Sequence, residues 1–275
     1  MIAVLLKLVD LRVEVDPLTG EPGAAAAGQT LSASPADRAA LETALQLAGA
    51  GEEVVAVSAG PSLTADATDT LLREALAVGA ARAVRVEIPA GTSSADVAAA
   101  IAPVITEARI VVCGDASLDR GSGAVPAFVA HHLKAAQALG LTTVSPAGEG
   151  LRVERRLDGG RREVLEVTAP AVLSVEEGLR LRRASLAALI RAREAAIEVV
   201  TQPAAIHAEG PPERLRPYRA PAPAASSQPA PDDPRARVLA LTGMLAPARA
   251  RRVVEADPAT CVDELLDYLA AHGYR

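Results

Sequence analysis

A loop rich in glycine and acidic residues follows a short apolar run near the middle of the chain. Residues 110–113 predict a buried strand that ends at Gly114, and a helical pattern covers 126–139 after a loop that holds Gly121 and Gly123. A strand, a loop and a helix in this order leave backbone N–H groups free at the helix start, where the helix dipole favours an anion. The spacing matches neither the dinucleotide pattern G-x-G-x-x-G nor a P-loop. The loop therefore predicts either a phosphate site or an ordinary connection between a strand and a helix.

Other polar residues of this region are weaker candidates. Ser122 could cap the helix or offer its hydroxyl group to a phosphate. Asp115 and Asp119 could hold Mg²⁺, but no further ligands stand near them in the sequence. His131 and His132 are adjacent in the predicted helix, so their side chains diverge by about 100° and cannot share one metal ion. The sequence contains no nucleophile elbow, zinc motif or Cys–His pair, so we expect no metal site and no catalytic side chains.

Composition and charge exclude several classes of protein. The chain has 275 residues, with 34 acidic against 28 basic side chains, a net charge of −6, one Phe, three Tyr and no Trp. Because a basic surface and aromatic side chains for stacking on bases are both missing, we expect no binding to nucleic acid. Cys113 and Cys261 match neither a disulfide framework nor a zinc pattern, which favours a reducing compartment. With no signal peptide and no apolar run of membrane length, we expect a cytoplasmic protein without membrane insertion.

Apolar runs and helical patterns alternate through the first half of the chain. Strands are expected near 2–9, 53–58 and 83–88, and helices at 35–50, up to Gly79, and at 93–107. Ser34 is the expected N-cap of the first helix, followed by Pro35. This order predicts an α/β fold, a Rossmann-like, doubly wound, mostly parallel sheet. Since ligands bind beyond the carboxyl ends of such strands, segments 8–12, 58–60 and 114–123 are expected around one crevice.

The second half adds a hairpin and a basic segment. Residues 152–157 and 162–167 flank Asp158-Gly159-Gly160 as in a hairpin, and 171–175 predict a further strand. Residues 178–200 predict an amphipathic helix that is rich in arginine. On its pattern alone this helix suits either a solvated helix that closes the domain or a contact surface.

The rest of the chain has too few apolar residues in sequence to form a core of its own. The expected organisation is a nucleotide-binding-like α/β domain over 1–201, a Pro- and Ala-rich linker over 202–234, and a C-terminal docking arm over 235–275. The arm is expected to hold a strand at 237–245 and an amphipathic helix at 261–271, with Val262, Leu265, Leu266 and Leu269 facing inward. Such an arm must dock on the main domain or on a partner.

Several stretches resemble the beta subunit of electron transfer flavoprotein. The most specific is VERRLDGGRREVLEVTAPAVLS at 153–174, which is similar to the signature hairpin of that family. VSAGP at 57–61, LREALAVGAARAVRVE at 72–87 and CVDELLDYL at 261–269 are similar to further parts of it. The resemblance implies one subunit of an alpha–beta heterodimer. In that family FAD is held mainly by the alpha partner, and the beta crevice holds AMP or, in electron-bifurcating relatives, a second FAD.

The resemblance also implies which residues would bind. By position, the nucleotide contacts fall on Leu5, Ser34, Ala59, Asp119, Ser122 and Gly123. The partner-recognition loop of the family corresponds to about 179–193, with Leu186 as the apolar anchor for a dehydrogenase and Leu189, Ile190 and Arg191 beside it. An exposed apolar side chain among charged residues suits a transient protein contact, in which electrostatic attraction speeds association.

The chain departs from the family pattern around the nucleotide. Ser34 replaces the asparagine that faces the nucleotide in relatives, and Asp115, Ala116 and Ala124 replace a basic residue and two glutamines. The recognition loop lacks the Asn-Glu-Pro of the family, and the loop after the first strand is shortened. These changes favour a weak or absent AMP site, a changed docking partner and a specialised paralogue of the type associated with the mycofactocin redox system.

The first functional hypothesis is therefore a non-catalytic electron carrier subunit that, with its alpha partner, takes electrons from a dedicated dehydrogenase and passes them towards the respiratory chain. The alternative is a stand-alone nucleotide-binding regulatory protein of similar fold. An ATP-dependent adenylate-forming enzyme would need a Ser- and Gly-rich loop after the first strand, which residues 9–12 do not supply.

Overall fold

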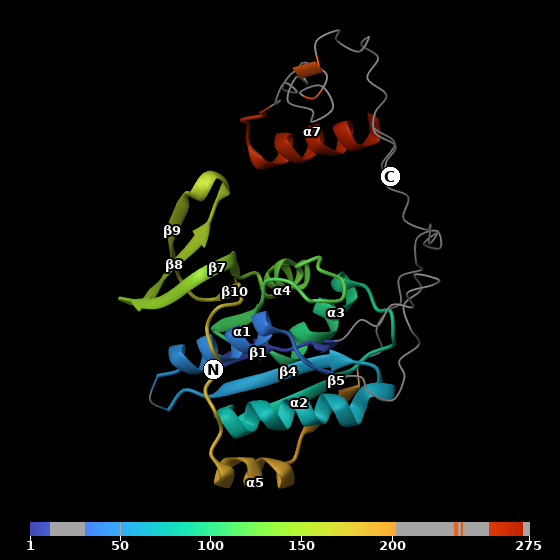
Figure 1. Ribbon diagram of the computed structural model, residues 1–275, viewed down its shortest axis with the longest axis vertical. Coiled ribbons are helices and arrows are strands. Elements are labelled where there is room, and N and C mark those ends of the chain that lie inside the picture. The colour runs from blue at the N-terminus through green and yellow to red at the C-terminus, as the bar shows by residue number, and fades with distance from the viewer. Residues whose placement is uncertain (12–30, 50, 202–233, 236–237, 239–252, 272–275) are drawn as a thin grey trace. The chain divides into compact units, whose positions relative to one another are not determined.

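The computed structural model describes residues 1–11, 31–49, 51–201, 234–235, 238 and 253–271 (Figure 1). The chain divides into two compact units, Met1–Pro211 and Pro212–Arg275. The predicted linker at 202–234 and the predicted strand at 237–245 lie almost entirely outside the described residues, so both remain predictions.

The first unit is built on a large sheet, as the sequence predicts. Within the described residues this sheet has nine strands in the order β11-β5-β4-β1-β6-β10-β7-β8-β9. All pairings from β11 to β7 are parallel, and the last two are antiparallel. The strands are β1 (Ile2–Leu5), β4 (Val54–Gly60), β5 (Arg82–Glu87), β6 (Ile110–Gly114), β7 (Ala136–Ala147), β8 (Gly150–Arg156), β9 (Arg162–Val167), β10 (Ala171–Val175) and β11 (Glu198–Thr201).

Helices cover both faces of the sheet, so the prediction of a doubly wound fold is confirmed. The helices α1 (Pro35–Leu47) and α2 (Ala65–Val78) pack on one face, and α3 (Ser94–Ile101) and α4 (Val125–Leu133) pack on the other. Successive residues of β1 enter opposite cores, since Val4 packs with α1 and α2 while Leu5 packs with α3 and α4. The β8–β9 hairpin extends away from these layers (Figure 1).

Local signals set most of these boundaries correctly. Ser34 caps α1 by accepting a hydrogen bond from the Asp37 N–H at 3.1 Å, and Pro35 follows at the first helical position. Ser93 caps α3 in the same way. Gly79 ends α2 with φ +129°, a conformation that L side chains rarely adopt. The expected strand at 2–9 is divided, because β2 (Leu8–Asp10) pairs with β3 (Leu31–Ala33) in a separate two-stranded sheet.

Two helix predictions extend into segments that form strands. The helix predicted over 126–139 ends at Leu133, where Lys134 turns to φ +50°, and β7 begins at Ala136. The helix predicted over 178–200 is reduced to α5 (Leu186–Glu194), and β11 follows it beside β5. Alanine, leucine and valine fit either structure locally, so pairing with a distant strand decides between them.

The second unit contains the amphipathic helix predicted at 261–271, observed as α7 (Pro258–Ala271). The expectation that Val262, Leu265, Leu266 and Leu269 face inward stays a prediction, and within the second unit Leu269 is half-buried. Val262 is 54% exposed, and Leu265 and Leu266 are each 57% exposed. Among the described helices of both units, none is long and apolar enough to cross a membrane.

Candidate ligand crevice

A cavity of about 360 Å³ opens at the carboxyl ends of β1, β4 and β6 in the first unit, where the topology predicts a ligand. Its apolar lining comes from the strand ends and from α3 and α4, and includes Leu5, Val57, Ile88, Val97, Ile101 and Val125. Thr64, Thr68, Thr92 and Ser94 add hydroxyl groups. An apolar wall with a few polar groups is typical of sites for a small ring-bearing molecule.

The structure gathers the predicted nucleotide contacts at this cavity, with one exception. Leu5, Ala59, Asp119, Ser122 and Gly123 line it. Ser34 does not, because it is 1% exposed and its hydroxyl oxygen caps α1. Ser34 therefore has a structural role that the sequence analysis assigned to it independently as an N-cap.

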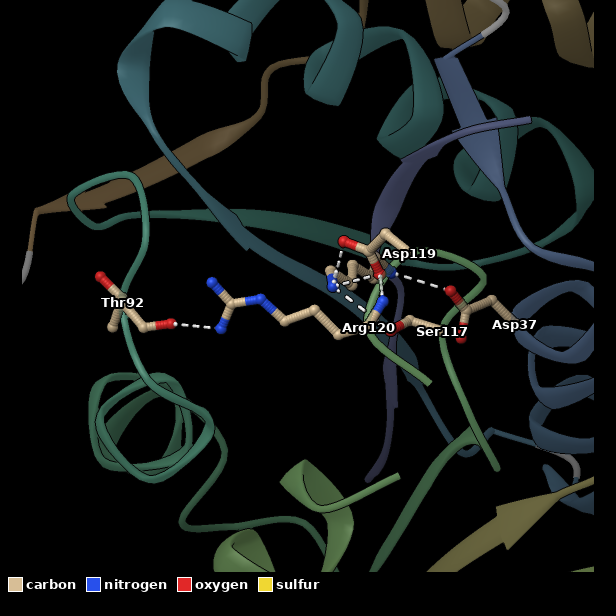
Figure 2. Close-up of polar contacts among 6 residues, drawn as sticks. Asp37, Thr92, Ser117, Asp119 and Arg120 are labelled. Carbon is tan, nitrogen blue, oxygen red and sulfur yellow. Dashed lines mark hydrogen bonds and ion pairs between the residues drawn. The ribbon is translucent and has the colours of Figure 1, made fainter. Parts of the chain in front are cut away.

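Lys7 lines the crevice but was not singled out from the sequence. Its Nζ lies 2.7 Å from each carboxylate oxygen of Asp119 and 3.3 Å from the hydroxyl oxygen of Ser117 (Figure 2). Partial burial raises the pKa of Asp119, but hydrogen bonds from Lys7 and Ser117 and the charge of Lys7 outweigh it and lower this pKa to about 2. Asp119 is thus ionised and neutralises Lys7. The sequence signal that could have indicated Lys7 is the position of a lysine just after the first buried strand.

Asp37 is a second residue that the sequence analysis passed over. Its carboxylate is buried behind the crevice and accepts the Lys7 backbone N–H at 3.0 Å and the Gly114 backbone N–H. Burial outweighs these hydrogen bonds and raises the pKa of Asp37 to about 6. A Cβ at Gly114 would lie 2.5 Å from Asp37 Oδ1, so only glycine fits there. Asp37 therefore ties the ends of β1 and β6 to the start of α1.

Arg120 crosses the mouth of the crevice. Its Nη1 donates to the backbone oxygen of Thr92 at 3.3 Å, so it connects the loop after β6 with the loop before α3 (Figure 2). The neighbouring Asp115 accepts the Ala116 N–H through its own carboxylate. Each contact uses one polar atom of the side chain, the Nη1 of Arg120 and the Oδ1 of Asp115.

The charges of the lining do not fit a phosphate group. Its ionisable side chains are the bases Lys7 and Arg120 and the acids Asp37, Asp115 and Asp119. The start of α4 offers fewer donors than expected, because Pro126 has no N–H and the Phe128 N–H is taken by the Ala124 oxygen. The predicted phosphate loop is therefore present as strand, loop and helix, but its donor set does not suit the phosphate of AMP or the diphosphate of a second FAD.

Cys113 lies at the inner end of the crevice and is not activated. Burial, followed by the charge of Asp37, raises the pKa of its thiol. Among the residues that the structure describes, no three His, Cys, Asp or Glu side chains form a group that could hold a metal ion.

Comparison with known proteins decides the family. A family model described as an electron transfer flavoprotein domain matches residues 24–205. The chain belongs to the electron transfer flavoprotein family. Its relatives are named as beta subunits. The bovine subunit is 30% identical over 205 residues, which cover 70% of this chain and 78% of the relative. The mitochondrial subunit of Oryza sativa subsp. indica is 32% identical over 206 residues, covering 71% and 79%. That of Bradyrhizobium diazoefficiens is 31% identical over 195 residues, covering 68% and 76%.

The electron transfer flavoprotein match over residues 24–205 includes the crevice lining except its residues 5–8, and it also includes the proposed docking segment. On α5, Leu186 is 74% exposed, Leu189 44% and Ile190 55%, and Arg191 is exposed beside them. Ala192 is buried and marks the inner side of this helix, which packs against α2. The apolar side chains of α5 therefore lie on its outer side, away from the core.

Proposed function

We propose that this chain is the beta subunit of a heterodimeric electron transfer flavoprotein. With an alpha subunit it would accept electrons from a dedicated dehydrogenase and pass them towards the respiratory chain. FAD, held mainly by the alpha subunit, supplies the redox chemistry when bound. The side chains of this chain then set distance, orientation and access, and none needs to act as an acid, base or nucleophile.

The observation that carries the proposal is the exposed apolar group on α5, formed by Leu186, Leu189 and Ile190. An isolated exposed leucine is ordinary, but three neighbouring large apolar residues on one short helix favour a contact surface. Arg191 and Arg193 are exposed on the same helix, and Arg183 is exposed just before it, which adds positive charge to this segment. This combination suits a transient partner with an apolar pocket in an acidic surface, as expected of an electron donor that must dock and leave quickly.

The helix α7 supports a second contact, with the alpha subunit, that lasts longer than the contact of α5 with a dehydrogenase. Val262, Leu265, Leu266 and Tyr268 are exposed on it. A helix with such a face gains stability by covering it, so we propose that this helix docks on the alpha subunit. The two proposed contacts differ in charge, since α7 contains no arginine while α5 contains two, Arg191 and Arg193.

The test is co-expression with an alpha-type subunit, followed by size-exclusion chromatography and extraction of bound nucleotide. A one-to-one complex that contains FAD and is reduced by a dehydrogenase is the expected result. If the chain remains colourless and separate from every alpha-type subunit offered, the proposal is wrong.

The second candidate is a stand-alone nucleotide-binding regulatory protein. It is favoured by one observation, that residues of the first unit enclose a cavity of about 360 Å³ at the carboxyl ends of β1, β4 and β6. This candidate predicts a homodimer that binds its ligand without an alpha subunit, so the same chromatography separates the two. The compartment that we propose is a reducing one such as the cytoplasm, in line with the free thiols of Cys113 and Cys261. The association with mycofactocin remains a prediction.

A further inference from the structure

We infer that the crevice selects an uncharged, ring-bearing ligand of nucleoside size and discriminates against its phosphorylated form. The inference goes beyond the proposed function, since it starts from the crevice as a candidate ligand site and specifies the chemistry of the ligand. It follows from the arrangement of five charged side chains around an otherwise apolar cavity.

The first step is that Lys7, a cation that could bind a phosphate, is already paired with Asp119. Lys7 points its ammonium group at Asp119, with both oxygens at 2.7 Å, and Ser117 accepts from it as well. A phosphate could contact Lys7 only by displacing Asp119, and the displaced carboxylate would then face the phosphate at close range. Like charges in a partly buried site repel strongly, so the exchange is unfavourable.

The second step is that Arg120, the other basic side chain of the lining, is outnumbered by carboxylates. Arg120 extends across the mouth to Thr92, while Asp115 stands beside the loop that would hold the anion. With Asp37 at the back, the lining holds three acids and two bases. A dianionic phosphate would enter a region that already carries net negative charge.

The third step is that the remaining surface suits a ring. The lining between the strand ends and the two helices α3 and α4 is aliphatic, with Leu5, Val57, Ile88 and Val125 among its members. The polar residue Thr68, which is 2% exposed, also belongs to this lining. The volume of about 360 Å³ accommodates a heterocycle with a sugar or a comparable polar chain.

The test uses two pairs of probes that differ only by one phosphate, adenosine with AMP and riboflavin with FMN. The full-length chain, alone and bound to its alpha subunit, is titrated calorimetrically with each probe at low and high salt. EDTA is present so that a divalent cation cannot bridge the phosphate to the carboxylates. In at least one pair we expect the uncharged member to bind about tenfold or more tightly than its phosphate. Because salt screens repulsion, the affinity for the phosphate should not fall as salt rises.

Variants make the inference specific to the named carboxylates. Asp119→Asn frees Lys7 and should improve the affinity for the phosphorylated probe about tenfold relative to its uncharged partner. Asp115→Asn is a second variant that removes a negative charge without touching Lys7, and it should shift the same ratio in the same direction. Glu74→Gln removes one charge from the exposed surface of α2 and is the matched control, for which the ratio should not change.

Three results would overturn the inference. The first is that AMP or FMN binds more tightly than its uncharged partner and that its affinity falls as salt rises. The second is that neither adenosine nor riboflavin binds. The third is that the ratio of the affinities for the phosphorylated and the uncharged probe is unchanged in both Asp119→Asn and Asp115→Asn. None of these affects whether the chain forms a complex with an alpha subunit and FAD. Failure of the inference is therefore distinguishable from failure of the proposed function.

Discussion

Arg182 donates three hydrogen bonds to the carboxylate of Glu42, which lies 140 residues earlier in the chain. The donors are its backbone N–H and Nε at 3.0 Å and its Nη2 at 2.9 Å. Glu42 is 5% exposed on α1, and although burial raises its pKa, the hydrogen bonds from Arg182 outweigh that effect and lower it. The contact fixes the segment just before α5 to the body of the first unit.

Arg182→Ala should loosen the proposed docking helix. It removes the two side-chain hydrogen bonds from Nε and Nη2 and leaves the buried Glu42 carboxylate without its charged partner, while the backbone N–H of residue 182 is retained. The free energy of unfolding should therefore fall by about 1–3 kcal/mol, allowing for the exposed half of the Arg182 side chain. Hydrogen exchange should accelerate in residues 182–194 more than in β1. Arg155→Ala breaks a half-buried pair with Glu163 on the hairpin and is the control, with an expected loss of about 0–1 kcal/mol. Equal protection of 182–194 in the wild type and in Arg182→Ala would contradict the role given to this contact.

Asp37→Asn should change how stability depends on pH. Burial raises the pKa of Asp37 from 3.8 to about 6, so the folded state holds this proton more tightly than the unfolded state. The contribution of Asp37 to stability is therefore greatest below pH 3.8 and falls as the pH rises to about 6. Relative to wild type, the variant should gain about 3 kcal/mol in free energy of unfolding across this window.

Urea unfolding at a series of pH values measures this gain. Asp66→Asn is the matched control, because Asp66 also stands in the first turn of a helix but is exposed. A difference between Asp37→Asn and wild type that stays constant with pH would rule out the buried, proton-holding carboxyl.

Gly114→Ala should destabilise the floor of the crevice. The added Cβ would meet Asp37 Oδ1 at 2.5 Å and the backbone of α1 at 3.0–3.1 Å, so the carboxylate or the helix start must move. We expect a loss of about 2–4 kcal/mol in thermal or urea unfolding. Gly49→Ala is the control, because nothing lies within 4 Å of its Cβ position, and its effect should stay within about 1 kcal/mol. Equal effects of the two substitutions would disprove the close approach.

Leu186→Ala should separate docking from stability. Since this side chain is 74% exposed, its removal should change the free energy of unfolding by less than about 0.5 kcal/mol. The rate of electron transfer from the dehydrogenase should nevertheless fall about tenfold or more, mainly through weaker binding. Leu63→Ala, at a position that is 94% exposed before α2, should leave that rate unchanged. If Leu63→Ala slows transfer as much as Leu186→Ala does, α5 is not the docking surface.

Leu265→Arg should weaken association with the alpha subunit. Leu265 is 57% exposed on α7, so the substitution leaves the core of the first unit intact. It introduces a charge into the apolar face that we propose to be covered, and burying an unpaired charge is unfavourable. Co-purification with the alpha subunit should be lost while the circular dichroism spectrum is retained. Glu264→Arg is the control. Because Glu264 already carries a charge, this substitution should reduce co-purification with the alpha subunit less than Leu265→Arg does.

The sequence by itself determined the features that depend on neighbours along the chain. Ser34 and Pro35 begin α1, Gly79 ends α2, and Asp158-Gly159-Gly160 turns the hairpin, because caps and turns need only local backbone geometry. The alternation of strands and helices likewise predicted the parallel sheet and the edge at which the crevice lies. The resemblance on 153–174 indicated the family, which the comparisons confirm.

Only the tertiary structure decided features that depend on residues far apart in the chain. Residues 136–139 and 198–201 are strands because β10 and β5 offer pairing partners that no local pattern reveals. The pairing of Lys7 with Asp119, which spans 112 residues, converts an apparent phosphate loop into a crevice of net negative charge. The burial that raises the pKa of Asp37 and lets it bridge β1 and β6 likewise exists only when three elements meet. Charge and burial at a site are properties of the assembled fold, so the sequence located the crevice but did not reveal which ligand chemistry it favours.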